Sequence, residues 1–228
     1  MKLHQLFFTF LLLLAAFQFC FSQEAPKAVL FDKFGRVGND ELQAHIDPFY
    51  SSVRDTNSKG YIIVYGTKDD QLTKYIFERH IKGCFRYRKL PDEIFIFALG
   101  EDRNKFETEL WQVPDGAEKS LFTETPRDYK ISKLTEPRMI SILSSDDDYC
   151  PLGFDMEFYS KFLKANSYIN GKIIIREKTY KDYQKEKQKY LLELIETNKV
   201  SVRQIKIVRG KYNGASDAEF WYVPKKRK

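Results

Sequence analysis

The sequence predicts an α/β (α+β) protein built from two tandem β-α-β-α-β-β units, and three observations support this fold class. Residues 60–66 form an uninterrupted apolar, β-branched run bounded by glycines, which is typical of a central strand buried on both faces. A similar run returns at 171–176 after another polar turn. The two tryptophans of the chain lie in nearly identical segments, at 109–114 and 219–224. The same pattern therefore occurs twice.

The spacing between matching segments indicates an internal duplication. Residues 158–160 echo residues 49–51 at a distance of 109 positions, while the apolar runs are 111 positions apart and the tryptophan segments 110. Because helices alternate with strands in each copy, we expect each unit to be a mixed sheet with its helices packed on one face. The tryptophan rings are expected to anchor each sheet to its helices.

The N-terminus predicts export. Lys2 and His4 precede an apolar stretch at 6–21, and small and polar residues follow it, which is typical of a secretory signal peptide at 1–22 with cleavage after Ser22. A retained membrane anchor is the alternative. No later stretch approaches the roughly 20 apolar residues that a membrane-spanning helix needs. We therefore expect a periplasmic or extracellular protein with no transmembrane segment in the mature chain.

The mature chain would be mildly basic. Removal of residues 1–22 leaves 206 residues with 37 basic and 32 acidic side chains, a net charge of +5. The charges of both signs are interspersed, so the composition allows an anionic cell-surface partner without indicating a nucleic-acid-binding protein. The absence of an Asn-x-Ser/Thr sequon weakly favours a bacterial host.

The first unit is expected at 23–114. Its first helix should begin near Asp40, and Pro48 inside the apolar pattern should kink or restart it. Its second helix should end near Gly83, before a basic loop at 85–89. Its four strands are expected at 28–32, 60–66, 93–99 and 106–113.

A polar segment at 115–137 is expected to be a linker, with a short strand at 129–131 as an option. The second unit is expected at 138–224, followed by a basic tail at 225–228. Its second helix, from Tyr180 to Ile195, should be the longer one. Its four strands are expected at 139–143, 171–176, 202–208 and 219–224.

This order of elements, with its buried second strand, resembles the OmpA-like domain, found at the C-terminus of outer-membrane protein A and in flagellar-motor stator proteins. The resemblance covers each unit separately, as two degenerate copies in an exported bacterial protein. It implies binding of peptidoglycan without cleavage, with an Asp after the second strand and an Arg on the next helix gripping the charged end of the peptide stem.

The residues carried over by this resemblance are Asp69 and Arg79. Residues 66–69 echo the family's Gly-His-Thr-Asp, but the Arg expected at position 76 is Ile76, and Arg79 lies one turn later. In the second unit, residues 176–178 replace the Asp-bearing loop and a tyrosine stands where Arg79 would align. The ligand motif is thus largely absent.

Few residues suggest catalysis. The mature chain has two histidines, His45 and His80, on different helices, and it lacks a Cys-x-x-Cys motif, so we expect no triad, metal site or cofactor. His80 is expected at the edge of a core. The acidic run at 146–148 is expected to be a solvated turn. Cys84 and Cys150 allow one disulfide, and the sequence leaves their pairing open.

We therefore expect an exported, non-enzymatic binding or scaffolding protein of the cell envelope, with peptidoglycan, another envelope polymer or an envelope protein as its partner. Arg86, Arg88 and Lys89 are candidate contacts to an anionic polymer, with a solvated loop as the alternative. The alternative function is a secreted hydrolase that uses carboxylates in a cleft between the two units. Glu109 and Glu219, which precede the tryptophans, are the duplicated acids.

Overall fold

The computed structural model describes residues 26–91, 93–117, 127–144 and 156–225. The expected signal peptide, the acidic run at 146–148, Cys150 and most of the basic tail lie outside these residues. Within the described ranges, no helix is long and apolar enough to cross a membrane.

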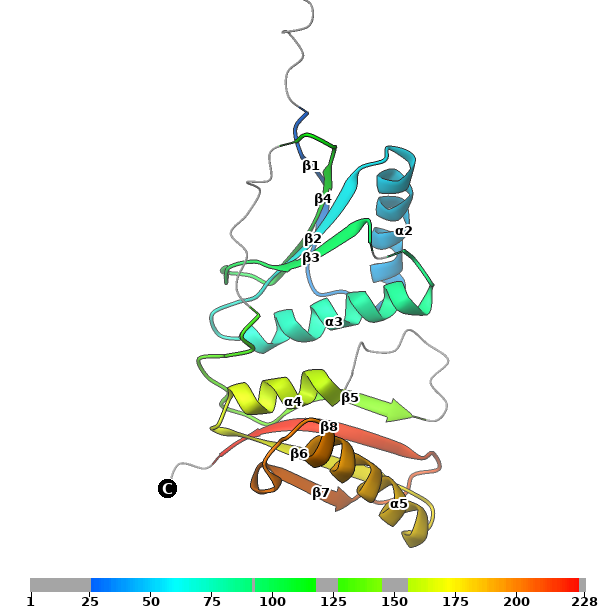
Figure 1. Ribbon diagram of the computed structural model, residues 1–228, viewed down its shortest axis with the longest axis vertical. Coiled ribbons are helices and arrows are strands. Elements are labelled where there is room, and N and C mark those ends of the chain that lie inside the picture. Colours follow the sequence, from blue (N-terminus) through cyan, green and yellow to red (C-terminus); the bar gives the residue numbers. More distant parts are fainter. Residues whose placement is uncertain (1–25, 92, 118–126, 145–155, 226–228) are drawn as a thin grey trace, which may run out of the picture.

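The described chain forms two α/β units, each a mixed four-stranded sheet with two helices (Figure 1). The first sheet has the order β1-β4-β2-β3 and the second β5-β8-β6-β7. Among the described strands each sheet has one parallel pair, β2 with β3 and β6 with β7, whose strands α3 and α5 connect, while its other pairs are antiparallel. The first unit comprises β1 (Val29–Phe34), α2 (Asn39–Asp55), β2 (Lys59–Tyr65), α3 (Gln71–Tyr87), β3 (Phe95–Leu99) and β4 (Glu107–Val113). The second comprises β5 (Arg138–Ser144), α4 (Met156–Ala165), β6 (Ile169–Arg176), α5 (Tyr180–Leu191), β7 (Ile205–Arg209) and β8 (Asp217–Pro224). The predicted fold class is confirmed.

The two sheets repeat each other in register as well as in order. Trp111 of β4 lies opposite Leu30 and Tyr61, and Trp221 of β8 lies opposite Met139 and Lys172. Both first strands also carry a register shift at the same point, directly after Leu30 and directly after Met139. A shared irregularity of this kind is conserved with a fold rather than produced by chance, so the two units indicate an internal repeat.

A glycine at the start of each central strand makes room for an aromatic ring from the preceding helix. A Cβ atom on Gly60 would lie 3.0 Å from the Phe49 ring, and one on Gly171 would lie 2.5 Å from the Tyr159 hydroxyl. The packing therefore matches Phe49 with Tyr159. The sequence comparison, which matched it with Phe158, is off by one residue because both copies carry adjacent aromatic residues.

The prediction that both central strands are buried on both faces is right for β2 and wrong for β6. From Gly60 onward every residue of β2 is buried, whereas burial alternates along β6. In the first unit a second apolar cluster covers the sheet face that the helices leave open, and it includes Tyr61, Ile63 and Val113. The corresponding face of the second sheet is half-exposed.

The structure excludes one of the two alternatives predicted for α2 and corrects the end predicted for α3. Helix α2 is continuous through Pro48 and does not restart there. Helix α3 passes Gly83 and ends at Tyr87, because Cys84 and Phe85 are buried in the core of the first unit and hold the last turn in place. Residues 85–87 of the expected basic loop are therefore helical. Helix α5 continues as a π-helical turn at Leu192–Thr197, and no strand forms at 129–131.

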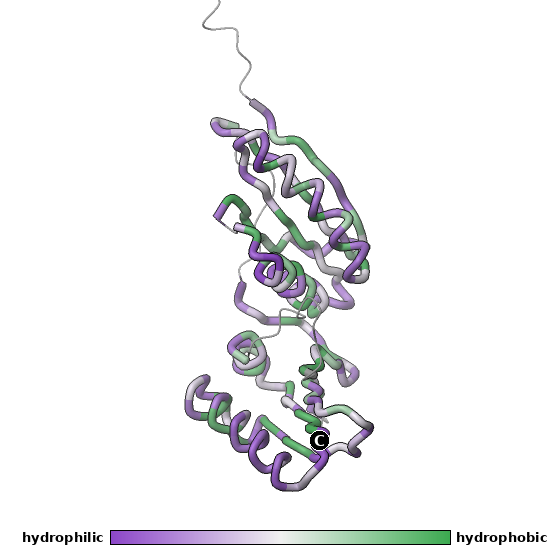
Figure 2. The backbone as a smooth tube through the Cα atoms, turned by 90° about the vertical axis from the view of Figure 1, so that its right-hand side faces the viewer, coloured by the Kyte–Doolittle hydropathy of each residue, from purple (hydrophilic) through white to green (hydrophobic). Residues whose placement is uncertain are grey.

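Helix α3 lies between the first sheet and α4 of the second unit, so it is enclosed by both units (Figure 1). Tyr75 of α3 contacts Phe162 of α4, with ring centroids 6.2 Å apart, and Tyr129 packs against both Tyr75 and Phe158. The cores of the two units consequently join in one apolar cluster. Helix α5, by contrast, is a mostly hydrophilic outer helix (Figure 2).

Candidate functional site

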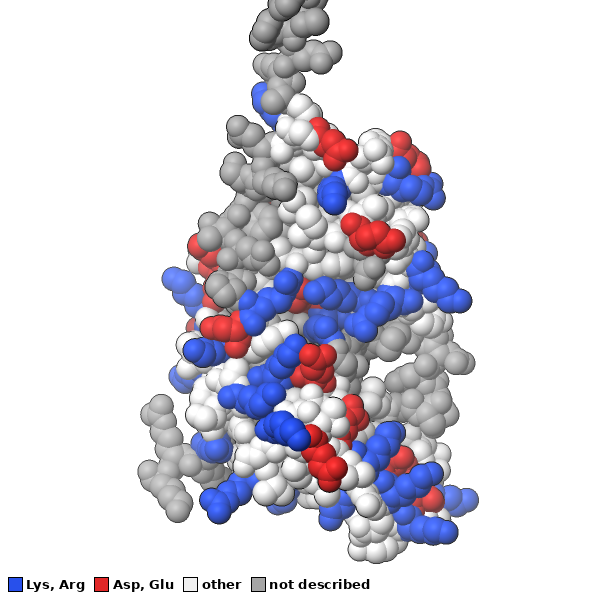
Figure 3. Space-filling view, viewed as in Figure 1, with Lys and Arg blue, Asp and Glu red and all other residues white. Residues whose placement is uncertain are grey.

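Four basic side chains gather beside α3, and we call them the α3 basic cluster: Arg79, Lys82, Arg86 and Arg127. The first three are spaced i, i+3 and i+7, which places them along one face of the helix. Lys82 and Arg127 both donate to the buried carboxylate of Glu78, at 2.6 and 2.9 Å. Figure 3 shows basic side chains in a band across the molecule at the level of α3.

The basic cluster borders a cavity of about 520 Å³ with aromatic walls. Phe85 of α3 stands edge-on to Phe95 and Phe97 of β3, with ring centroids 4.8 and 5.4 Å away. The Lys82 ammonium lies 5.1 Å from the centre of the Phe97 ring, within cation–π range. Arg79, Lys82 and Arg86 line the same cavity, together with one acid, Glu157. A ligand there would meet flat apolar rings beside positive charge.

The cluster holds more positive charge than its carboxylates neutralise. Burial lowers the pKa of Arg79, and the nearby Arg86 lowers it further. Burial likewise lowers the pKa of Lys82; Glu78 opposes this shift, while Arg127 and Arg79 add to it. An anion that entered this site would relieve the mutual repulsion of the cations.

Of the three predicted polymer contacts, the structure places Arg86 in the basic cluster. Arg88 follows the end of α3 and pairs with Asp47, and Lys89 is exposed with a left-handed backbone (φ 53°). The sequence reasoning missed Arg79 and Lys82 as neighbours of Arg86, although their helical spacing is a readable signal. Arg127 is contributed by a segment 41 residues beyond Arg86, and only the fold brings it close.

The structure does not bring Asp69 and Arg79 together. Asp69 is exposed in the loop before α3 and lines a different cavity, with residues 133–137. Arg79 lies more than two turns along α3, where its guanidinium sits 5.6 Å from the centre of the Phe158 ring. Tyr190, which aligns with Arg79 in the second unit, is buried against Phe220.

The tryptophans do not anchor the sheets to the helices, because they lie on the opposite face. In each unit the indole Nε1 donates to the glutamate two residues earlier, Trp111 to Glu109 and Trp221 to Glu219, both at 2.9 Å. A guanidinium completes each arrangement: Arg103 bonds Glu109 at 2.7 Å and Arg176 bonds Glu219 at 2.5 Å. These duplicated acids are engaged in structural contacts within separate sheets.

Burial raises the pKa of Glu109, but bonds from Arg103, Trp111 and Tyr65 outweigh that effect, and the net pKa is lower than usual. A general acid needs the opposite shift. Within the described ranges, no group of three or more His, Cys, Asp or Glu side chains is arranged to hold a metal ion. His45 contacts Asp32 at 2.6 Å and stacks on Phe34.

Cys84 is buried and disulfide-bonded. Because Cys150 lies outside the described residues, the pairing of these two cysteines stays a prediction.

Comparisons with protein-family models, curated proteins and solved structures give no match. They therefore assign the chain to no family.

Proposed function

We propose that this chain is an exported, non-enzymatic binding protein of the bacterial cell envelope that holds an anionic cell-surface polymer on the α3 basic cluster. The observation that carries the proposal is the convergence of three cations and three phenylalanine rings around one cavity, with a fourth cation, Arg127, held beside them by Glu78. Guanidinium groups pair with carboxylates and phosphates, and aromatic rings provide flat apolar surface for the body of a repeating unit.

The spacing of the cations suits a polymer with repeated charges. Arg79 and Arg86 are seven residues apart on one helix face, about 10 Å at 1.5 Å per residue. Successive charges of a polymer could contact both residues. Because Glu78 is bonded to two of the cations, the site keeps them in position before the polymer arrives.

We further propose that both units are degenerate OmpA-like domains, a relation supported by their shared element order and mixed sheets. The separation of Asp69 from Arg79 gives little support to the family's grip on a peptide stem. An anionic component of the envelope is therefore favoured over the stem itself. The hydrolase alternative has less support, because the duplicated acids Glu109 and Glu219 lie in separate sheets and each is bonded to a guanidinium group and an indole.

The test measures binding of the purified chain to polygalacturonate and to peptidoglycan sacculi in separate assays. The triple variant Arg79→Ala, Lys82→Ala, Arg86→Ala should weaken polygalacturonate binding roughly tenfold to a hundredfold, from about 0.5–1 kcal/mol for each cation. Binding by the unchanged chain should also fall steeply between low and physiological salt, since the contacts are electrostatic.

A matched control removes the same charge elsewhere. Lys178, just before α5, and Lys181 and Lys185, within it, are exposed, and their triple alanine variant has the same net charge as the test variant. This control should bind nearly as well as the unchanged chain. Equal losses in both variants, or binding that does not respond to salt, would overturn the assignment. Binding to sacculi that the Asp69→Ala variant abolishes would instead support the peptide-stem grip.

A further inference from the structure

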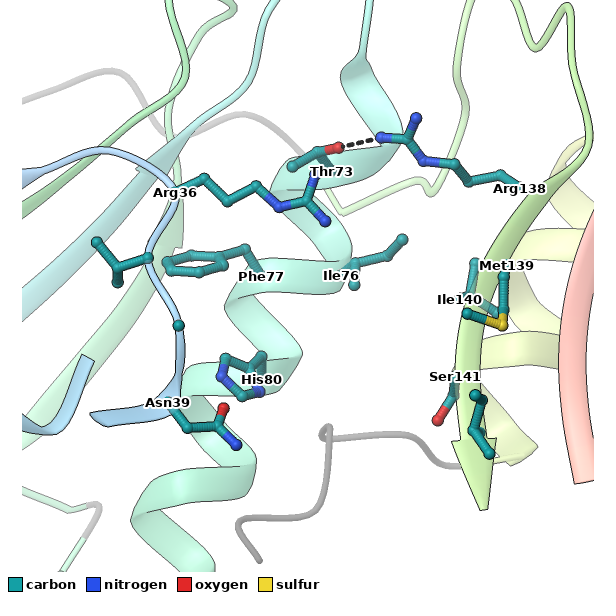
Figure 4. A pocket seen from close by; sticks show the side chains of 13 residues that line it. Arg36, Asn39, Thr73, Ile76, Phe77, His80, Arg138, Met139, Ile140 and Ser141 are labelled. Carbon is teal, nitrogen blue, oxygen red and sulfur yellow. Dashed lines mark hydrogen bonds between the residues drawn. The ribbon is translucent and has the colours of Figure 1, made fainter. Parts of the chain in front are cut away.

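A second cavity lies on another side of α3, between the two units. It has a volume of about 520 Å³, within the range of small-molecule sites. Three segments enclose it: the loop before α2, helix α3 and strand β5. Its middle is apolar, with Ile76, Phe77 and Met139 facing the space between the units (Figure 4).

One end of this inter-unit cavity carries positive charge. The guanidinium groups of Arg36 and Arg138 lie at the same end (Figure 4), where Arg138 also donates to the Thr73 hydroxyl at 2.9 Å and pairs with Asp70. No acidic side chain is among the described residues that line the cavity. This end therefore suits one carboxylate.

The other end carries buried polar atoms that lack partners. His80 and Ser141 are 5% and 2% exposed, and within the described chain neither His80 Nδ1 nor the Ser141 hydroxyl makes a hydrogen bond. Both residues line the cavity, His80 from α3 with the Asn39 amide beside it and Ser141 from β5 on the opposite side (Figure 4). Unpaired buried polar groups are costly, so two of them facing one cavity indicate a polar partner there.

We propose that the inter-unit cavity binds a medium-chain carboxylate with a hydroxyl or carbonyl group at its far end. The carboxylate pairs with Arg36 and Arg138, the chain lies between the apolar walls, and the far group bonds Ser141 and His80. Thr73 and His80 are seven residues apart on α3, about 10 Å, which an extended chain of about eight to ten carbon atoms covers. This inference does not depend on polymer binding by the α3 basic cluster.

Calorimetric titration with three matched ligands tests the assignment. The purified chain should bind ω-hydroxydecanoate tightest; decanoate lacks the far hydroxyl, and decanediol lacks the carboxylate. Loss of either polar end should weaken binding roughly tenfold, the usual effect of one hydrogen bond or charged contact. Equal affinity for all three ligands, or no binding by any, would overturn the proposal.

Two variants assign each end of the ligand. Arg36→Gln should remove the preference for ω-hydroxydecanoate over decanediol, and Ser141→Ala should remove its preference over decanoate. Because Ser141 is buried without a partner, Ser141→Ala should melt at the same or a higher temperature, which separates lost binding from lost folding. Arg203→Gln, at an exposed site in the second unit, should change nothing.

Variants that weaken all three ligands equally would contradict the assigned roles. Arg36→Gln should also bind polygalacturonate normally, and the triple variant of the α3 basic cluster should bind ω-hydroxydecanoate normally. Either proposal can thus fail while the other stands.

Discussion

In the first unit the central strand β2 is buried on both faces of its sheet, whereas its counterpart β6 in the second unit is buried on one. The pairing registers match Ile63 with Ile174 and Tyr65 with Arg176. Ile63 is fully buried, while Ile174 is half-exposed and Arg176 replaces an aromatic ring by a charge. The two copies keep the same strand order while differing in what covers the outer face of each sheet.

The helices after the central strands differ even more. The positions that match Arg79, Lys82 and Arg86 are Tyr190, Glu193 and Thr197, so the second unit has no counterpart of the α3 basic cluster. Helix α3 is enclosed by both units, but α5 is buried at two positions only, Tyr183 and Tyr190. The duplicated scaffold therefore positions one specialised helix, and both proposed sites lie beside it.

The largest expected contrast comes from the matched pair Ile63→Ala and Ile174→Ala. The first should lower the free energy of unfolding by about 3 kcal/mol and the second by about 1 kcal/mol, because only Ile63 is packed on all sides. Urea denaturation of the full chain measures both values. Similar losses would show that the outer face of the second sheet is covered as fully as that of the first.

A smaller contrast is expected between the two arginines that hold the duplicated glutamates. Arg176 bonds both Asp217 and Glu219, at 2.7 and 2.5 Å. Arg176→Gln leaves these two largely buried carboxylates without that cation and should lower the free energy of unfolding by about 2 kcal/mol. A fully buried pair would lose more, because water still reaches this site.

In the first unit Arg103→Gln should lower the free energy of unfolding by less, about 1 kcal/mol, because Glu109 and Glu107 keep other donors. Glu109 keeps the Tyr65 hydroxyl at 3.0 Å and Trp111, and Glu107 keeps Lys105 at 3.0 Å. Denaturation measurements on Arg54→Gln, an exposed arginine of α2, provide the baseline. A larger loss for Arg103→Gln than for Arg176→Gln would reverse this ranking.

The fold class could be predicted from the sequence because the same order of strand and helix patterns occurs in both halves of the chain. The apolar runs and the Trp-bearing segments occupy equivalent strands in both sheets, with the spacings seen along the chain. Exposure of the outer face of β6 was partly readable, because Lys172 and Arg176 stand where the first copy has Tyr61 and Tyr65. The prediction of burial on both faces rested on the isoleucines that the two runs share. Gly83 was misread as a helix end because the tertiary packing of Phe85 overrides a local signal.

The candidate sites were less accessible to sequence reasoning. Arg86 was identified from a basic run, but Arg127, Phe95 and Phe97 join it only after folding. The inter-unit cavity depends on the docking of α3 against β5, two elements that are more than 50 residues apart in the chain. A buried hydroxyl such as that of Ser141 has no signature in sequence, because its missing partner is a property of the packed structure.

The smallest expected effect is the acid response of the first unit. Because the folded pKa of Glu109 is below its ordinary value of 4.5, the unfolded chain binds a proton first as the pH falls. The stabilisation is complete above pH 4.5 and is lost as the pH falls through the folded pKa. When melting is followed from pH 6 to pH 3, Glu109→Gln should therefore show a smaller fall in Tm than the unchanged chain, by about 2–4 °C for each 1 kcal/mol of lost stabilisation. Glu101→Gln, which removes an exposed acid of the same unit, should show the same fall in Tm as the unchanged chain. If both variants show the same fall in Tm as the unchanged chain, the acid sensitivity comes from other carboxylates. The contacts of Glu109 would then not distinguish the acid response of the first unit.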